Sequence, residues 1–166
     1  MLKTALISLS KASWARQIVM NWKPARKAAS RFVSGEKLED AIHVIAGLNR
    51  KGIRATLDHL GENTTNLQES RQATADILTA IDAIERSAVQ ANVSLKLTQI
   101  GLSLGTDICS ENLSKILSYA NDRQIFIRID MEDSSTVDRT LGLWRQMLAA
   151  GYTNTGVVIQ AYLHRS

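Results

Sequence analysis

The spacing of apolar positions changes repeatedly along the chain from Gly35 onward. Apolar residues recur every three or four positions in 37–50, 66–92, 110–121 and 136–150, which predicts four amphipathic helices. Runs rich in β-branched residues at 53–60, 93–99, 124–131 and 156–163 predict four strands. Because helices and strands alternate, we expect α/β architecture, with a parallel sheet connected by right-handed crossovers.

Each predicted strand has one apolar face and one polar face, since neighbouring side chains point to opposite sides of a strand. The apolar face consists of Ile53, Ala55, Leu57, Leu95, Leu97, Ile125, Ile127, Ile129, Val157 and Ile159. The other face, predominantly polar, consists of Arg54, Thr56, Asp58, Ser94, Lys96, Thr98, Phe126, Arg128, Asp130, Val158, Gln160 and Tyr162. An open doubly wound sheet is covered by helices on both faces and should be apolar on both. The pattern therefore favours a barrel whose inner face surrounds a ligand, and the alternative is a one-sided sheet whose polar face meets water.

Four strands are too few to close such a barrel. A (βα)₈ barrel needs eight strands in about 250 residues, whereas this chain of 166 residues predicts four strands. We therefore expect residues 35–166 to be half of a TIM-type barrel that stops after its fourth strand. The first and last strands would be open edges, which invite pairing with a second chain.

Candidate chemistry lies where the strands end. The apolar run 125–129 stops at Asp130, and active sites of parallel α/β proteins lie at the carboxyl ends of strands. Lys96 and Gln160 end two other strands on the same face. A lysine suits a carboxylate or phosphate, a nearby acid can position a group or accept a proton, and an amide can both donate and accept. The alternative is a structural Lys96–Asp130 ion pair.

Other charged residues of this region predict structural roles. We expect Asp58 to be neutralised by Arg54 or Arg128 deeper in the barrel, because a buried charge needs a partner. Glu132 and Asp133 are expected in the loop or at the start of the following helix, where acids favour the helix dipole.

The first 34 residues predict one or two basic amphipathic helices. Residues 1–37 hold eight Lys or Arg and one acid, so this segment carries +7 of a chain whose net charge is +4. Three interpretations remain open: helices that pack on the domain, a membrane-surface helix, or a targeting segment. No recognised nucleic-acid motif accompanies the charge, so DNA binding is disfavoured.

Several classes of chemistry lack their signatures. The single cysteine, Cys109, permits no internal disulfide and fits a reducing compartment. The three histidines do not have zinc-ligand spacing, so no metal site is predicted. The sequence contains no glycine-rich phosphate loop and no apolar run of the roughly 18 residues needed for a membrane span.

Five sequence blocks, in order and with fitting spacing, resemble bacterial monofunctional proline dehydrogenases. They are RFVSGE (31–36), TLDHLGE (56–62), SLKLTQIGL (94–102), FIRIDMEDS (126–134) and VVIQAYLHRS (157–166). The resemblance implies a flavoenzyme, built on a distorted (βα)₈ TIM-type barrel, that oxidises L-proline to Δ1-pyrroline-5-carboxylate, with hydride passing to FAD and electrons to a quinone. It implies that Lys96 binds the proline carboxylate, that Asp130 is catalytic, and that Met131 and Gln160 line the flavin.

The resemblance also implies a cytoplasmic enzyme, with peripheral contact at the inner membrane face. The family's RLVKGAY block and its C-terminal arginine pair, which complete the flavin and carboxylate sites, are missing from this sequence. We therefore expect an N-terminal half with little or no activity alone. The alternatives are a non-catalytic half-barrel that pairs through its edges, or a membrane-surface binder built on the basic helices.

Overall fold

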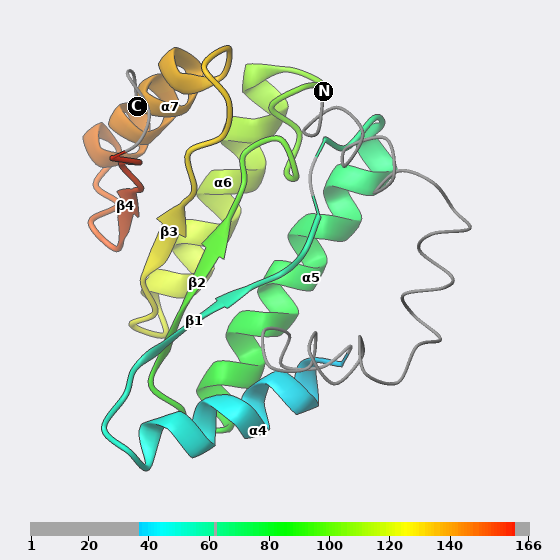
Figure 1. Cartoon of the computed structure of the whole chain (residues 1–166). Helices are drawn as coiled ribbons and strands as arrows, with labels where there is room; N and C mark the ends of the chain where they lie inside the picture. Colours follow the sequence, from blue (N-terminus) through cyan, green and yellow to red (C-terminus); the bar gives the residue numbers. More distant parts are fainter. Residues whose placement is uncertain (1–36, 62, 162–166) are drawn as a thin grey trace, which may run out of the picture. The chain divides into compact units, whose positions relative to one another are not determined.

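The computed structural model describes residues 37–61 and 63–161, in which four helices alternate with four strands (Figure 1). The order is α4 (Leu38–Asn49), β1 (Ala55–Asp58), α5 (Leu67–Arg86), β2 (Ala91–Leu95), α6 (Thr106–Asn121), β3 (Ile127–Ile129), α7 (Val137–Ala149) and β4 (Thr155–Val157). The predicted sequence of elements is confirmed, although the strands are shorter than predicted. The predicted helices of residues 1–34 lie outside the described residues.

The four strands form one parallel sheet in the order β1-β2-β3-β4. In the register, Asp58 lies beside Ser94, Ser94 beside Arg128, and Arg128 beside Gly156. Residues that share such a row present their side chains on the same face. The parallel sheet predicted from sequence is therefore confirmed, and its carboxyl ends lie at a single edge.

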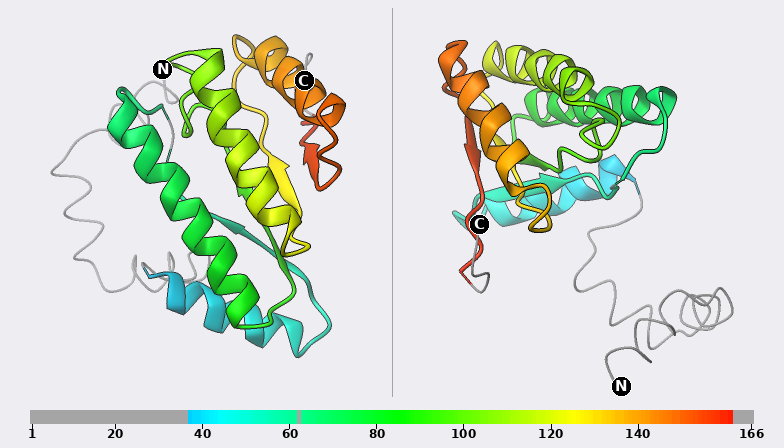
Figure 2. Two further views of the ribbon diagram at one scale, coloured as in Figure 1. Left: turned by 180° about the vertical axis from the view of Figure 1, so that it is seen from behind. Right: turned by 90° about the horizontal axis from the view of Figure 1, so that it is seen from above.

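Helices α5, α6 and α7 cover one face of the sheet (Figure 2). The core beneath them contains Val93, Leu95, Leu97, Ile127 and Ile129, which are at most 1% exposed. The apolar face predicted from sequence is thus confirmed for β2 and β3. It is wrong at its ends, where Ile53 is 49% and Ile159 is 66% exposed. These two residues lie outside the paired segments of β1 and β4, so the sheet does not hold them against the helices.

Two helix boundaries differ from the prediction. Helix α5 ends at Arg86, and Ala88 then adopts a positive φ of 48°, a conformation that a helix cannot continue through. Helix α6 begins at Thr106, directly after Gly105.

At the start of α5 the side chain of Asn66 accepts a hydrogen bond from the Glu69 amide at 2.9 Å, a regular N-cap.

A polar cluster joins α5 to the end of α6 on the outer surface. The Tyr119 hydroxyl donates to Asp82 at 2.6 Å, and the guanidinium carbon of Arg123 lies 3.6 Å from the centre of the Tyr119 ring. Arg123 Nε lies 2.9 Å from a carboxylate oxygen of Glu85. The hydrogen bond to Asp82 is the main reason that the pKa of Tyr119 lies above its usual value. The cluster therefore links α5 to the end of α6 by polar contacts as well as by the apolar core.

We expect the Cys109 thiol to be inert in the folded chain. Cys109 is fully buried, and its burial, with a smaller contribution from the charge of Glu132, raises the thiol pKa to about 12. Because the thiolate is the nucleophile, reaction with a disulfide reagent at pH 8 should be at least about tenfold slower than in denaturant. Equal rates in the two conditions would show that this part of the core opens readily.

Candidate active site

Lys96 and Asp130 emerge side by side from neighbouring strands. They directly follow Leu95 and Ile129, which are paired in the register of β2 and β3. The backbone amide of Asp130 donates to the Leu95 carbonyl at 2.9 Å, so the pairing of the two strands continues up to the acid. The sheet thus brings an ammonium and a carboxylate to the same end of two adjacent strands, as the sequence predicted.

The two charged groups have different ion-pair partners. Lys96 Nζ lies 3.7 Å from Asp58 Oδ2, at the end of β1. Asp130 Oδ1 accepts from Arg128 Nε at 3.2 Å, and Asp130 Oδ2 accepts from the buried Ser94 hydroxyl at 3.0 Å. The alternative of a direct Lys96–Asp130 pair is not found among the ion pairs of the described residues. The predicted neutralisation of Asp58 by Arg54 or Arg128 is wrong, because the ammonium of Lys96 reaches Asp58 from the neighbouring strand.

The pairings leave both groups partly accessible. The side chain of Asp130 is 21% exposed and that of Lys96 is 24% exposed. Both carboxylate oxygens of Asp130 accept hydrogen bonds. The distance of 3.7 Å between Lys96 Nζ and Asp58 Oδ2 is longer than a usual hydrogen bond. A ligand carboxylate can therefore compete with Asp58 for the Lys96 ammonium, while Asp130 keeps a fixed orientation.

Met131 and Gln160 meet beyond the ends of β3 and β4. Gln160 Nε2 donates to the Met131 carbonyl at 3.2 Å, which joins the segment after β4 to the segment after β3. Met131 is buried, with 3% of the residue exposed. The two residues that the resemblance assigns to the flavin are therefore in contact, next to Asp130.

A connection that the sequence analysis missed lies between Thr98 and Glu132. The backbone amide of Thr98 donates to Glu132 Oε2 at 3.2 Å, and the Thr98 hydroxyl donates to Glu132 Oε1. Glu132 lies in the loop, as expected, but it reaches back to the loop after β2. Asp133 matches the expectation of a residue ahead of α7: hydrogen bonds from the Ser135 hydroxyl and amide lower the pKa of its carboxyl group.

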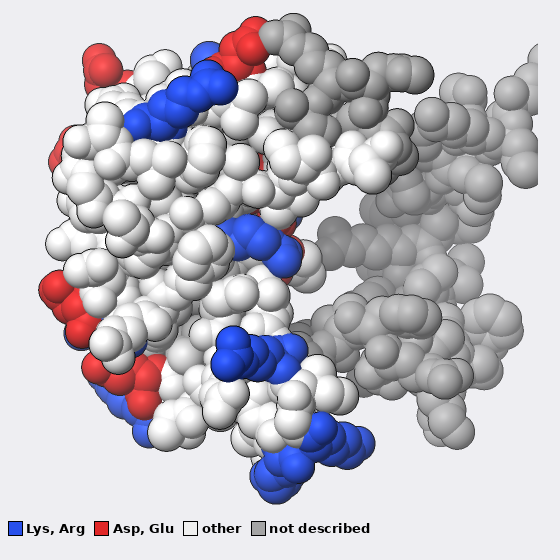
Figure 3. Space-filling model, turned by 90° about the vertical axis from the view of Figure 1, so that its left-hand side faces the viewer, with Lys and Arg blue, Asp and Glu red and all other residues white. Residues whose placement is uncertain are grey.

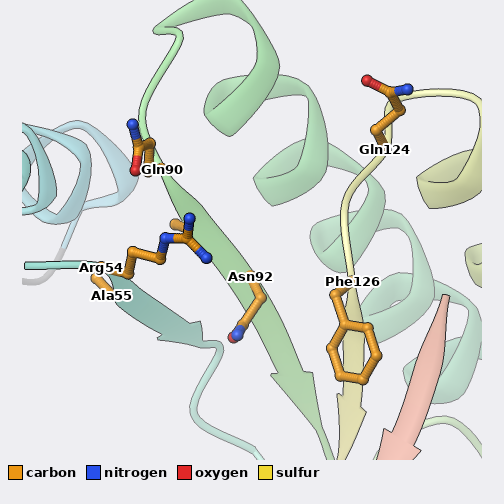
Figure 4. Close-up of a pocket in the computed structure, with 7 residues that line it drawn as sticks. Arg54, Ala55, Gln90, Asn92, Gln124 and Phe126 are labelled. Atoms are coloured by element: carbon orange, nitrogen blue, oxygen red, sulfur yellow. The ribbon is translucent and has the colours of Figure 1, made fainter.

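The opposite end of the polar face holds a pocket of about 330 Å³, lined by Arg54, Ala55, Gln90, Ala91, Asn92, Gln124 and Phe126 (Figure 4). Arg54 extends from the start of β1 across β2 (Figure 4). The side-chain oxygen of Asn92, Oδ1, is buried without a hydrogen-bond partner among the described residues. Since parallel α/β proteins place their chemistry at the carboxyl ends of strands, this amino-end pocket is not the candidate active site.

Basic side chains stand as separate groups on the face seen in Figure 3, and acidic side chains adjoin some of them. That face offers no continuous basic band of the kind that follows a nucleic-acid backbone. In the described part of the chain, no group of three or more His, Cys, Asp or Glu residues could hold a metal ion. None of the helices described is both long and apolar enough to cross a membrane.

Comparison with known proteins identifies the family. A sequence model described as proline dehydrogenase matches residues 41–166. The chain belongs to the proline dehydrogenase family. The resemblance read from the five blocks is confirmed, and this is a family of oxidoreductases.

Two curated relatives are similar over most of this chain. Proline dehydrogenase 1 of Bacillus subtilis is 40% identical over 141 residues, which cover 85% of this chain and 46% of the relative. Proline dehydrogenase 2 of the same species is 34% identical over 158 residues, covering 95% and 52%. The chain thus spans about half the length of these proline dehydrogenases.

The fold is also similar to solved structures of proline utilization A. The protein from Bdellovibrio bacteriovorus, inactivated by N-propargylglycine, aligns with a TM-score of 0.78 at 22% identity. The alignment covers 91% of this chain and 18% of that protein. At this identity the likeness concerns the fold, and it supports a TIM-barrel-like arrangement of the βα units.

Proposed function

We propose that this chain forms the N-terminal half of a proline dehydrogenase, which oxidises L-proline to Δ1-pyrroline-5-carboxylate. The observation that carries the proposal is the position of Lys96 and Asp130 at the ends of adjacent strands, in a chain that matches the family from residue 41 to 166. In this proposal the Lys96 ammonium exchanges Asp58 for the proline carboxylate. Asp130, held by Arg128 and Ser94, is the catalytic-site acid that orients the substrate amine.

Met131 and Gln160 would form one wall of a flavin site. Their contact at the strand ends supports this role, because an amide can bond the polar edge of a heteroaromatic ring. FAD, when bound, would accept the hydride from proline and pass electrons to a quinone. The chain's own contribution is to hold the substrate carboxylate and to position the flavin against it.

A second polypeptide segment, equivalent to the rest of the relatives, would complete the barrel. The relatives are about twice as long as the matched part. β1 and β4 are the outermost strands of the sheet, and Leu60 beyond β1 and Ile159 beyond β4 are 77% and 66% exposed. The pocket around Arg54 and Asn92 would receive side chains of the added strands. The complete enzyme would be cytoplasmic, with the basic segment of residues 1–34 in peripheral contact with the membrane.

The open edges also favour a second candidate function, a non-catalytic half-barrel that pairs through them. Strand edges with exposed apolar residues are pairing surfaces whether or not chemistry follows. This candidate predicts a colourless, stable oligomer, whereas the first predicts a yellow protein once the barrel is complete.

The test is to titrate with FAD and to assay proline-dependent dye reduction, first with this chain alone and then with a paired protein that completes the barrel. The paired protein is this chain co-expressed with the part of Bacillus subtilis proline dehydrogenase 1 that lies beyond the match. We expect neither flavin binding nor turnover from the chain alone, and both from the paired protein. Turnover by the chain alone would contradict the half-barrel, and a colourless paired complex would favour the non-catalytic candidate.

A further inference from the structure

Both oxygens of the Glu132 carboxylate accept hydrogen bonds from one residue far back in the sequence. They accept the backbone amide and the hydroxyl of Thr98, which lies 34 residues earlier. Glu132 is half-buried and Thr98 is buried, so these bonds are made away from bulk water. Hydrogen bonds to a charged acceptor are about twice as strong as neutral ones.

Thr98 also connects the loop after β1 to the loop after β2 through hydrogen bonds. Its carbonyl accepts both the amide and the hydroxyl of Thr64, at 3.2 and 3.0 Å. Its hydroxyl oxygen also accepts the amide of Asn63 at 3.3 Å. Thr98 and Glu132 therefore join the loops that follow three successive strands, β1, β2 and β3, by hydrogen bonds.

The hydrogen bonds between Thr98 and Glu132 lie next to the candidate catalytic groups. Lys96 precedes Thr98 by two residues, and Asp130 precedes Glu132 by two residues. A shift of either loop therefore moves the ammonium or the carboxylate. Active sites need their groups held to within about 0.5 Å by surrounding contacts.

We propose that Glu132 is a positioning residue, whose bonds to Thr98 set the distance between the Lys96 ammonium and the Asp130 carboxylate. The reaction to which this positioning applies rests on the proposed function. Both Thr98 groups donate to Glu132, and the charge of the carboxylate strengthens both hydrogen bonds. In Glu132→Gln the side chain keeps its size but loses this charge, and its NH₂ group can only donate, so the Thr98 hydroxyl has to accept instead of donating.

The decisive test uses the full chain without proline or flavin. Lysines are labelled by reductive ¹³C-methylation, carboxylates by ¹³C-aspartate, and the signals of Lys96 and Asp130 are followed by NMR during a pH titration. We expect Glu132→Gln and Thr98→Val each to shift both signals, and the double variant to shift them no further than either alone. Thr98→Ser keeps both donors and should leave the signals in place.

Asp133→Asn is the matched control, since it removes the same charge one residue away. Its carboxylate bonds Ser135 in its own loop and does not contact Thr98. Unchanged Lys96 and Asp130 signals in Glu132→Gln would overturn the proposal, even if the Thr98 amide exchanged faster. Equal shifts in Asp133→Asn would also overturn it, because long-range charge alone would then explain them.

A second measurement uses the paired protein. Loss of positioning should raise KM for proline or lower kcat by about tenfold in Glu132→Gln, and Thr98→Ser should retain the parent values. Absence of turnover in the parent pair would count against the proposed function. The NMR comparison would still decide the positioning role, because it needs neither substrate nor cofactor.

Discussion

Replacing Ile127 by alanine should lower the free energy of unfolding by about 3 kcal/mol, within the range of about 2–5 kcal/mol for such core truncations. Ile127 is fully buried at the centre of β3, with β2 on one side and β4 on the other. Its side chain lies in the core beneath the helices. Because small domains are stable by only about 5–15 kcal/mol, the loss should appear as a clear fall in the urea midpoint.

Phe126→Ala is the matched control on the same strand. Phe126 is a larger residue, but it lies on the opposite face, is 42% exposed and lines the amino-end pocket. Its ring lies over Gly156, where an added Cβ would come within 3.0 Å of the ring. We expect a loss below about 1.5 kcal/mol, since much of the ring is already in water. A larger loss for Phe126→Ala than for Ile127→Ala would mean that the two faces of the sheet are assigned the wrong way round.

The contrast between these neighbours explains why the sheet could be predicted. The alternation of Ile125, Ile127 and Ile129 with Phe126 and Arg128 is a local pattern, and local patterns fix which face of a strand meets the core. The alternation of helices and strands then specifies a parallel sheet. The ends of the strands could not be predicted in this way. Ile53 and Ile159 continue the apolar pattern, but their burial depends on pairing that stops before them.

The ion pairs could not be predicted from the apolar and polar pattern, for a related reason. Periodicity places Asp58, Lys96 and Asp130 on one face but says nothing of the stagger between strands. The stagger decides that Lys96 reaches Asp58, and that Asp130 is held by its own neighbour Arg128. Glu132 was missed because an acid ahead of a helix has an ordinary explanation in the helix dipole. Only the proximity of two loops shows that its partner is Thr98.

In the paired protein, Asp130→Asn should lower kcat/KM for proline by about a hundredfold, the scale of loss when a contact that orients the substrate is removed. The variant keeps the size of the side chain but removes the charge that neutralises Arg128 at 3.2 Å. The amide also offers one acceptor oxygen where Arg128 and Ser94 each need one. The measurement is proline-dependent dye reduction, with flavin content determined from its absorbance.

Two companion variants separate the role of Asp130 from a general effect of charge. Asp133→Asn removes an equal charge from an exposed carboxylate that bonds Ser135, and it should change kcat/KM by less than about twofold. Ser94→Ala leaves the Asp130 charge in place but removes one of its hydrogen bonds, so its effect should fall between the other two. Full activity in Asp130→Asn, with normal flavin content, would remove Asp130 from the catalytic site. It would leave Lys96 as the polar-face residue on which a proline site depends.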